Sequence, residues 1–399
     1  MSIKNIKIVA GSSFGDEGKG LMTDYFCSQA KNRNENCIVV CSNGGSQRGH
    51  TVSTPEGIRH VFHHFGSGTF TGADTYFSEE FIVNPMVFRQ EYEELERLGF
   101  KPKVYVNDKC LWTTPFDMII NQIAEEDRGE NRHGSCGQGV WETIVRSKEW
   151  YIHGNLNSTY VSNPIMLKTI LETIRRVYVP FRLSKLGIEE IPADWINIIN
   201  NPGLIEHYME DMKFFLEHTE FANDYVLYSY SNVVFENGQG LLLDQNRKEY
   251  GDNTTPSNTG ICNPLKVIYP IGLDCENTDV EVCYVTRTYL TRHGAGRFDE
   301  ECNKAEINAE MEDLTNIPNP HQGLLRYGKL DYEKLHERIA ADLMELYPFE
   351  KTAIKKSLAI THINEYPAGD YNNLFDGFCI YESDGMTRDS VKLVDTNQK

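Results

Sequence analysis

Residues 11–20 read Gly11-Ser12-Ser13-Phe14-Gly15-Asp16-Glu17-Gly18-Lys19-Gly20, a glycine-rich stretch that contains two acids and one lysine. A short β-branched run, residues 6–10, precedes it, and residues 19–31 have the spacing of a helix. Strand, glycine loop and helix in this order form a phosphate cradle, because glycines let the backbone approach the anion and a helix start attracts negative charge. The stretch therefore predicts a P-loop-like nucleotide fold.

The loop differs from a Walker A motif at the position that would bind the metal. In that motif Ser or Thr follows the lysine and binds magnesium, whereas Gly20 follows Lys19 here. A bound Mg²⁺ then needs another oxygen ligand, and Asp16 inside the loop is the candidate. The alternative for a glycine loop taken alone is a tight turn with solvated charges.

The rest of the chain alternates apolar runs with helical patterns, which predicts an α/β fold with a mainly parallel central sheet and helices on both faces. Further strands are expected at residues 37–41, 103–106, 233–236, 282–285 and 358–361. A helical pattern places Leu335, Ile339, Leu343 and Leu346 on one face. We expect a single domain, residues 1–399, with a helical insertion at roughly 150–225 that includes a helix at 202–221. Residues 300–323 are expected to form a long surface loop.

Composition excludes several classes of protein. The chain of 399 residues has 39 Lys and Arg against 58 Asp and Glu, a net charge of −19, which makes duplex nucleic acid an unfavourable partner. The ten cysteines have no zinc-like spacing, as expected for a reducing, cytoplasmic compartment. Because no segment reaches the ~18 apolar residues of a membrane span, we expect a soluble protein with no membrane partner.

Five segments in chain order resemble one family, adenylosuccinate synthetase. The family signature GDEGKG stands at residues 15–20. Residues 44–52 (GGSQRGHTV) resemble its GG-x-N-A-GHT segment, and residues 235–244 (FENGQGLLLD) resemble FEGAQG-x-LLD. Residues 255–258 (TPSN) and 291–296 (TRHGAG) resemble TSSN and TRVGAG. The resemblance covers most of the chain.

The family uses a nucleoside triphosphate to phosphorylate the 6-oxygen of a purine nucleotide, and aspartate then displaces the phosphate. The resemblance implies that Asp16 is the base for purine N1 and a magnesium ligand, with Gly49 as a second ligand. It also implies that Lys19 is catalytic and that a protonated His50 stabilises developing charge, although a lone histidine is more often structural. The implied triphosphate-binding residues are Gly15, Glu17, Gly18, Lys19, Gly20, Gly49, Thr51, Asn364, Ser383 and Gly385.

The resemblance also implies a site for the purine monophosphate. Residues 135–139 (SCGQG) resemble the TTGRG phosphate loop, with Cys136 in place of a threonine and Gln138 in place of an arginine. Arg146 falls where the family has an arginine that the partner subunit lends, which implies a homodimer; the alternative is a solvated helix residue. The implied monophosphate-binding residues are Ser13, Gln47, Ser135, Cys136, Arg146, Gln239 and Thr255.

Two departures from the family concern the substrates. The family selects GTP with the carboxylate of a T-K-x-D element, whereas residues 361–364 read THIN. The amide of Asn364 offers one acceptor and a donor that opposes the guanine edge, so ATP becomes the expected donor. The family's arginine-rich loop for aspartate corresponds to residues 319–331, where only Arg326 stays in register. Candidate contacts for the amino acid are therefore Thr291, Arg292 and Arg326.

These departures are similar to the phage branch of the family, which makes 2-aminoadenine nucleotides from dGMP with ATP. Phage enzymes of that branch replace the catalytic aspartate by a smaller residue, whereas Asp16 is intact here. The leading hypothesis is a ligase that joins L-aspartate to a purine deoxynucleotide, dGMP before IMP, with ATP and Mg²⁺. The alternatives are the ordinary enzyme for IMP and GTP, a ligase for another amine, and a nucleotide-binding protein without catalysis.

Overall fold

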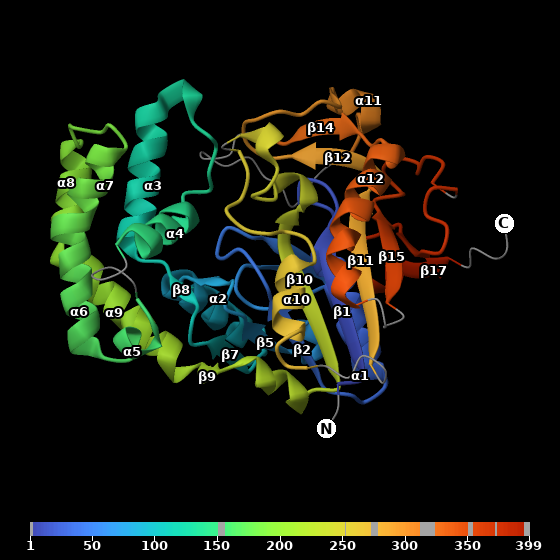
Figure 1. The fold of residues 1–399 in the computed structure, drawn as a ribbon, viewed down its shortest axis with the longest axis horizontal. Coiled ribbons are helices and arrows are strands. Elements are labelled where there is room, and N and C mark those ends of the chain that lie inside the picture. Colours follow the sequence, from blue (N-terminus) through green and yellow to red (C-terminus); the bar gives the residue numbers. More distant parts are fainter. Residues whose placement is uncertain are drawn as a thin grey trace.

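A computed structural model of the chain describes residues 3–150, 156–251, 253–272, 278–311, 324–349, 354–371 and 373–394. Within these ranges a ten-stranded sheet forms the centre of the molecule (Figure 1). From one edge to the other its strands are β17 (Val391–Val394), β16 (Cys379–Ser383), β15 (Lys355–Thr361), β11 (Asp279–Arg287), β1 (Asn5–Gly11), β10 (Asn232–Gly240), β2 (Cys37–Cys41), β5 (Asp74–Phe77), β7 (Val104–Asn107) and β9 (Glu220–Ala222).

Parallel pairing dominates the sheet, as the sequence predicted. Strand β1 pairs in parallel with β10 on one side and with β11 on the other, and only the edge strand β17 runs antiparallel to its neighbour. All five residues of β2 are buried, which is typical of a strand covered on both faces. The carboxyl ends of β1, β10, β11 and β15 consequently lie at the same edge of the sheet, where α/β proteins hold ligands.

Helices cover both faces of the sheet. On one face α1 (Lys19–Asn32) packs its residues Met22 and Phe26 against Val9, Val39 and neighbouring strand residues. On the other face α10 (Cys262–Ile268) and α12 (Tyr332–Leu343) pack over β10 and β11, with Leu335 and Ile339 fully buried. Burial of each such side chain stabilises the fold by about 1.5–3 kcal/mol.

Smaller sheets accompany the central one. Strands β3 (His50–Ser53) and β4 (Arg59–Phe62) form a hairpin, and β6 (Ile82–Val83) pairs with β8 (Leu111–Trp112). A three-stranded sheet contains β12 (Tyr289–Arg292), β14 (Arg326–Lys329) and β13 (Glu301–Cys302). Helix α2 (Pro85–Arg97) follows β6, and the side chain of Asn84 caps it.

A group of helices stands beside the sheet, on the left in Figure 1. These are α3 (Pro115–Arg128), α4 (Val140–Glu149), α5 (Ser158–Val161), α6 (Pro164–Thr173), α7 (Val179–Lys185), α8 (Ala193–Asn200) and α9 (Pro202–Glu217). The helical stretch begins earlier than the expected insertion, at Pro115, where a Thr114–Asp117 capping box and a proline in the first turn start a helix.

Two predictions of local structure were wrong. The helix expected to reach residue 221 ends at Glu217, and residues 220–222 join the sheet as the edge strand β9. The segment expected to be a loop from residue 300 contains β13 and α11 (Lys304–Asn308), while residues 312–323 lie outside the described part of the chain. None of the helices in the described ranges combines the length and apolar character that a membrane crossing requires.

Candidate active site

The glycine loop is held in shape by its own acid. One carboxylate oxygen of Glu17 accepts hydrogen bonds from the main-chain nitrogens of Ser13 (2.8 Å) and Gly15 (3.0 Å). Gly15 has φ 108°, and a Cβ atom there would lie 2.7 Å from the Cα of Gln239, so only glycine fits. Glu17 therefore stabilises the loop from within.

Lys19 lies at the start of α1, below this loop. Its ammonium donates to the carbonyl of Gly15 and lies 3.9 Å from Glu17 Oε2. Burial lowers the pKa of Lys19, while the carboxylates of Glu17, Asp16 and Glu236 act in the opposite direction. The helix start and a buried cation thus meet where a phosphate would lie.

A cleft opens over this loop and brings the predicted triphosphate-binding residues together. Gly15, Glu17, Gly18, Lys19, Gly20, Gly49, Thr51, Asn364 and Gly385 all line it, as do Asp16 and His50. Ser383 does not line the cleft: its buried hydroxyl donates to the carbonyl of Gly385 at 3.1 Å and so shapes that turn. Residues that the sequence analysis missed, among them Arg59, Arg287 and Glu365, also line it.

Asp16 faces two cationic side chains. Its Oδ2 lies 3.5 Å from Arg287 Nη2 and 3.6 Å from His293 Nε2. Although burial opposes ionisation, Arg287 and His293 hold the pKa of Asp16 well below its ordinary value. Arg287 Nε also donates to the main-chain oxygen of Asp16 at 2.5 Å. The carboxylate is therefore ionised at neutral pH, the form that a base or a metal ligand requires.

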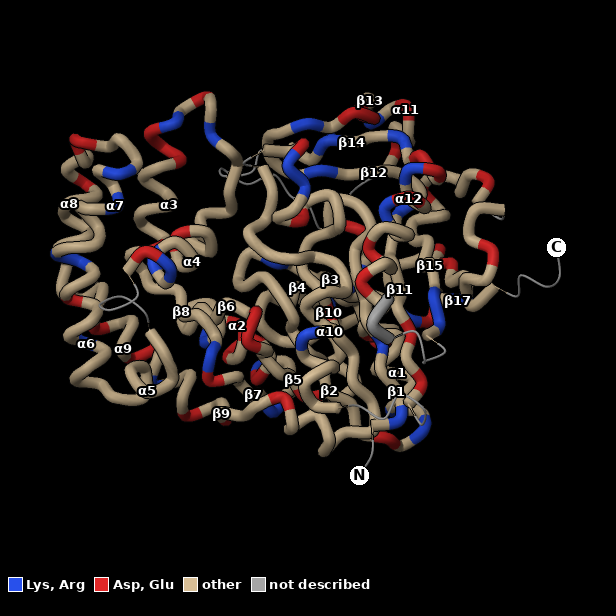
Figure 2. The backbone as a smooth tube through the Cα atoms, viewed as in Figure 1, with Lys and Arg blue, Asp and Glu red and all other residues tan. Residues whose placement is uncertain are grey.

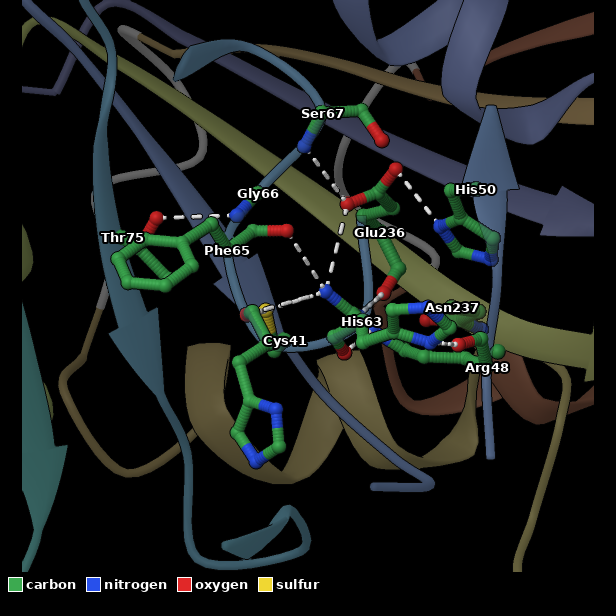
Figure 3. Close-up of polar contacts among 12 residues, drawn as sticks. Cys41, Arg48, His50, His63, Phe65, Gly66, Ser67, Thr75, Glu236 and Asn237 are labelled. Atoms are coloured by element: carbon green, nitrogen blue, oxygen red, sulfur yellow. Dashed lines mark hydrogen bonds and ion pairs between the residues drawn. The ribbon is translucent and has the colours of Figure 1, made fainter. Parts of the chain in front are cut away.

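His50 lies at the start of β3, against a buried acid from β10. Its Nδ1 is 2.8 Å from Glu236 Oε1, and Figure 3 shows the ring turned toward that carboxylate. Burial lowers the pKa of His50 to about 4; the carboxylate of Glu236 opposes this effect, and the nearby cations Lys19 and Arg48 add to it. The protonated His50 that the resemblance implies stays a prediction, because it concerns the state in which a phosphoryl group lies beside the ring.

Glu236 connects His50 to the core. Its Oε2 accepts from the main-chain nitrogen of Ser67 (3.1 Å) and lies 3.7 Å from Arg48 Nη2 (Figure 3). Histidine and arginine together hold the pKa of Glu236 at about 2 against the effect of burial. Arg48 in turn donates to the carbonyls of residues 63–65. The FENGQG segment contains Glu236, but its pairing with His50 could be seen only in three dimensions.

The predicted purine-binding amides approach each other around Gly44. A Cβ atom on Gly44 would lie 3.3 Å from Gln47 Nε2 and 3.5 Å from Gln239 Oε1. The Oε1 atoms of both glutamines are buried, and the described residues offer them no hydrogen-bond donor. Gln239 also adopts φ 56°, an unusual conformation for a residue other than glycine. Two amide oxygens without donors, beside a strained backbone, are typical of a ligand site.

The remaining monophosphate candidates lie on other elements. Ser135 and Cys136 lie beside α3, where the Ser135 hydroxyl donates to Asn121 Oδ1 at 3.1 Å. Thr255 donates its main-chain N–H to the carbonyl of Leu243 at 2.8 Å. Burial raises the pKa of the Cys136 thiol.

Arg146 does not lie where the resemblance placed it. It is 1% exposed and donates to Asp117 Oδ1 (2.8 Å), Asp117 Oδ2 (2.9 Å) and the carbonyl of Trp112 (2.7 Å). An arginine that is paired bidentately within its own core cannot also reach a second subunit. The expectation of a lent arginine, and the homodimer derived from it, lose this support.

The candidates for the amino acid lie on β12 and β14. Thr291 is buried, and Arg292 donates to the carbonyls of Ala295 (2.9 Å) and Asn253 (3.4 Å). Arg326 forms a bidentate pair with Glu301 and donates to the carbonyl of Gly296. The structure therefore brings both arginines to the TRHGAG turn, but their donors stabilise that turn. Residues 319–323 of the corresponding family loop lie outside the described ranges.

The residues around the loop fit a magnesium ion of the kind that substrate phosphates help to bind. Mg²⁺ commonly takes one or two carboxylates together with phosphate oxygens. Asp16 supplies an ionised carboxylate at the cleft, and Gly49 lines the same cleft. The described part of the chain contains no cluster of three metal-binding side chains, so phosphate oxygens would complete the site.

Comparison of the sequence with known proteins agrees with the geometry. Residues 8–332 match the family model described as adenylosuccinate synthetase. The protein of that name from Synechocystis is 26% identical over 314 residues, which cover 77% of this chain but only 65% of that relative. The one from Borrelia duttonii is 24% identical over 344 residues, covering 84% of this chain and 74% of the relative.

Two solved structures share the fold. Fully ligated adenylosuccinate synthetase from Plasmodium falciparum superposes with a TM-score of 0.71 at 15% identity, covering 98% of this chain and 100% of that one. Succinoaminodeoxyadenylate synthetase (PurZ) of cyanophage S-2L, bound to dGMP and to dATP as an energy donor, superposes with a TM-score of 0.63 at 14% identity. This match covers 98% of this chain and 95% of that one. Since the family model matches well over half of its residues, the chain belongs to the adenylosuccinate synthetase family.

Proposed function

We propose that this protein is a carbon–nitrogen ligase that phosphorylates the 6-oxygen of a purine nucleotide and replaces the phosphate with L-aspartate. The observation that carries the proposal is the convergence of Asp16, Lys19 and His50 on one cleft above the start of α1. A protein that only binds nucleotide has no use for an ionised base beside a buried lysine and a paired histidine.

Each side chain has a role in the first half-reaction. The Asp16 carboxylate accepts the proton from purine N1, which makes the 6-oxygen nucleophilic. Lys19 and the N–H groups at the start of α1 stabilise the phosphoryl group as negative charge develops on it. A phosphoryl group beside His50 favours its protonated form, and Glu236 at 2.8 Å holds the ring in position. Magnesium, held by Asp16 and Gly49, would neutralise phosphate charge.

ATP is the proposed energy donor. Asn364 lines the cleft at the position where the family has a guanine-binding carboxylate. Its amide would leave one donor of the guanine edge without an acceptor, at a cost of roughly 1–3 kcal/mol. The structural neighbour from cyanophage S-2L, described with dGMP and dATP, supports dGMP as the purine substrate.

A second candidate is the ordinary reaction of IMP with GTP. The relatives from Synechocystis and Borrelia duttonii are named for it, and Asp16, the base that this reaction needs, is intact. The two candidates share the loop, the cleft and His50. They differ in the purine 2-amino group and in the base of the triphosphate.

Product analysis separates the candidates. The purified protein receives Mg²⁺, aspartate and an equal mixture of IMP, GMP, dGMP and dIMP, with ATP or GTP supplied separately, and mass spectrometry identifies any succinylated product. We expect a succinylated dGMP product with ATP, and none from Asp16→Asn. Preferential conversion of IMP with GTP would favour the second candidate. Nucleotide binding without phosphate release, in both wild type and Asp16→Asn, would instead indicate a binding protein.

A further inference from the structure

Arg338 extends from helix α12 to the glycine loop. The helix packs on the sheet through Leu335 and Ile339, which places the neighbouring Arg338 over the carboxyl end of β1. Its Nε donates to the main-chain oxygen of Ser12 at 3.2 Å, and its Nη2 donates to the hydroxyl of Ser13 at 3.1 Å. Two donors on one edge of the guanidinium therefore fix its orientation.

The donors on the other edge of the Arg338 guanidinium are available to an anion. The residues that the structure describes form no ion pair with this side chain and supply no acceptor for its Nη1–Nη2 edge. Burial lowers the pKa of Arg338, and the carboxylate of Glu17 opposes that effect. A half-buried guanidinium without a paired acid has lost part of its hydration, and an anionic ligand can replace it.

Arg338 also lies next to the segment expected to bind the amino acid. The Ser13 that it contacts is followed by Phe14, whose ring lies 4.8 Å from the Arg292 guanidinium and 5.1 Å from the ring of Phe298. Arg326 stacks on Phe298 at 5.3 Å. Figure 2 shows the Lys and Arg segments of β12, β14 and α12 gathered in this region.

The neighbouring arginines are less available than Arg338. The Nε and Nη2 atoms of Arg326 pair with Glu301, and its Nη1 donates to the carbonyl of Gly296. The terminal nitrogens of Arg292 donate to main-chain carbonyls. Among the described residues the Arg292 Nε has no hydrogen-bond partner, but it is enclosed, so it offers a ligand a single N–H and no fork. Arg338 thus has a planar pair of donors still available, which is the geometry that a carboxylate accepts bidentately.

We infer that Arg338 binds a carboxylate of the amino-acid substrate and replaces, from a helix, the arginine cluster that the 319–331 segment lacks. The inference rests on the proposed function, since it assigns a residue to its second substrate. Arg338 is absent from the lining of the triphosphate cleft. Ser135 and Cys136, expected to hold the phosphate of the purine nucleotide, lie beside α3 and not beside α12. Ser13, another candidate of the purine monophosphate site, does contact Arg338, but the amino-acid candidates Arg292 and Arg326 pack against the adjoining rings of Phe14 and Phe298 and favour the amino acid.

Kinetics of matched variants test the inference. Arg338→Met keeps the aliphatic length, Arg338→Lys keeps the charge without the fork, and Lys334→Gln changes an exposed cation of the same helix. For Arg338→Met we expect the KM for aspartate to rise at least about tenfold, as loss of a charged hydrogen bond predicts, with the KM values for both nucleotides within twofold of wild type. The KM of Arg338→Lys for aspartate should lie between those of wild type and Arg338→Met. The KM of Lys334→Gln should equal that of wild type.

Two further measurements keep the outcomes distinct. Thermal unfolding and ATP binding show whether Arg338→Met retains the fold and the loop, and Ser13→Ala removes the hydroxyl contact while leaving the cation. A normal aspartate KM in Arg338→Met, or a rise confined to the purine nucleotide, would overturn the inference and leave the proposed function standing. If wild type shows no aspartate-dependent turnover, the proposed function fails. Calorimetric titration with L-aspartate then tests the role of Arg338 separately. Aspartate binding that is present in wild type and lost in Arg338→Met would support that role, and equal binding to both would overturn it.

Discussion

Replacing Glu236 by glutamine should both destabilise the fold and remove the carboxylate that holds the His50 ring in position. The buried carboxylate lies 2.8 Å from His50 Nδ1 and 3.7 Å from Arg48 Nη2, and it accepts from the main-chain nitrogen of Ser67. Glutamine has the same shape, but it removes the negative charge beside Arg48, and its amide nitrogen, if it faces His50, requires the ring tautomer in which Nδ1 accepts. The Arg48 guanidinium then stays buried with weaker compensation.

The structure gives the magnitude in two ways. The pKa of Glu236 is about 2 against an ordinary 4.5, and a difference of about 2.5 units corresponds to about 3 kcal/mol of folding free energy. Removing one partner of a buried ion pair typically costs about 3–5 kcal/mol. We therefore expect Glu236→Gln to lose about 3 kcal/mol at pH 7.

The pH dependence has a definite sign. Because the carboxyl pKa is lowered on folding, its contribution is complete above the unfolded value of 4.5 and disappears as the pH falls through about 2. The difference between wild type and Glu236→Gln should consequently shrink by about half at pH 3. Ser67→Ala is the matched control, since the described residues offer its buried hydroxyl no partner and its main-chain N–H remains.

Urea unfolding at pH 7.5 and pH 3 measures this difference, and phosphate release measures the effect on His50. We expect kcat to fall about 100-fold or more in Glu236→Gln, the usual loss when a charge-stabilising group is disturbed. Equal stability of Glu236→Gln and wild type at pH 7.5, or a stability gap that does not change with pH, would refute the reasoning.

Three other perturbations follow from the structure. Asn364→Asp should move the preference for the triphosphate from ATP toward GTP by about tenfold or more in kcat/KM, and an unchanged preference would remove Asn364 from base recognition. Arg146→Met leaves Asp117 buried without its partner and should cost about 3–5 kcal/mol in urea unfolding, with no change in mass by light scattering; a loss of subunits without a loss of stability would restore the lent arginine. Burial raises the pKa of Asp342 to about 6 from 3.8, so its stabilising contribution is complete below about pH 4 and is lost as the pH rises through 6. Between pH 4 and pH 7 the free energy of unfolding of Asp342→Asn should therefore increase relative to that of wild type by up to about 3 kcal/mol, as measured by urea unfolding. Stability profiles that stay parallel over this pH range would contradict the prediction.

The sequence predicted the parts of the fold whose signal is local. Strand β2 was predicted at its observed residues because all five side chains are apolar or small and buried on both faces. The strands β5, β16 and β17 were not predicted: β17 has two exposed residues, and β5 and β16 depend on pairing with β2 and β15, which lie further away in the chain. Residues 220–222 fit a helical pattern in the sequence, but in the structure they pair with β7 at the edge of the sheet.

The candidate site shows the same division. The glycine loop, Asp16, Lys19 and His50 could be found because they lie in short motifs of unusual composition. Glu236 and Arg287 act on them from β10 and β11, and nothing in the spacing of the chain shows that these strands flank β1. The Arg146 prediction failed for a related reason: its register matched, but Asp117, 29 residues earlier, takes its guanidinium into the core.

Recognition of the amino acid shows how far a comparison by register can mislead. Aligned by sequence, the loop that binds aspartate in the family has lost its arginines, which suggested another amine or no catalysis. In space, a guanidinium with two donors that the described residues leave unpaired comes from α12 to Ser13, next to Phe14, because the helical spacing buries Leu335 and Ile339. Ligand binding depends on where a charge lies in space and not on where its residue lies in the sequence. The loss of a motif is therefore evidence against a function only when no other element can bring an equivalent charge to the same point, and here α12 brings Arg338.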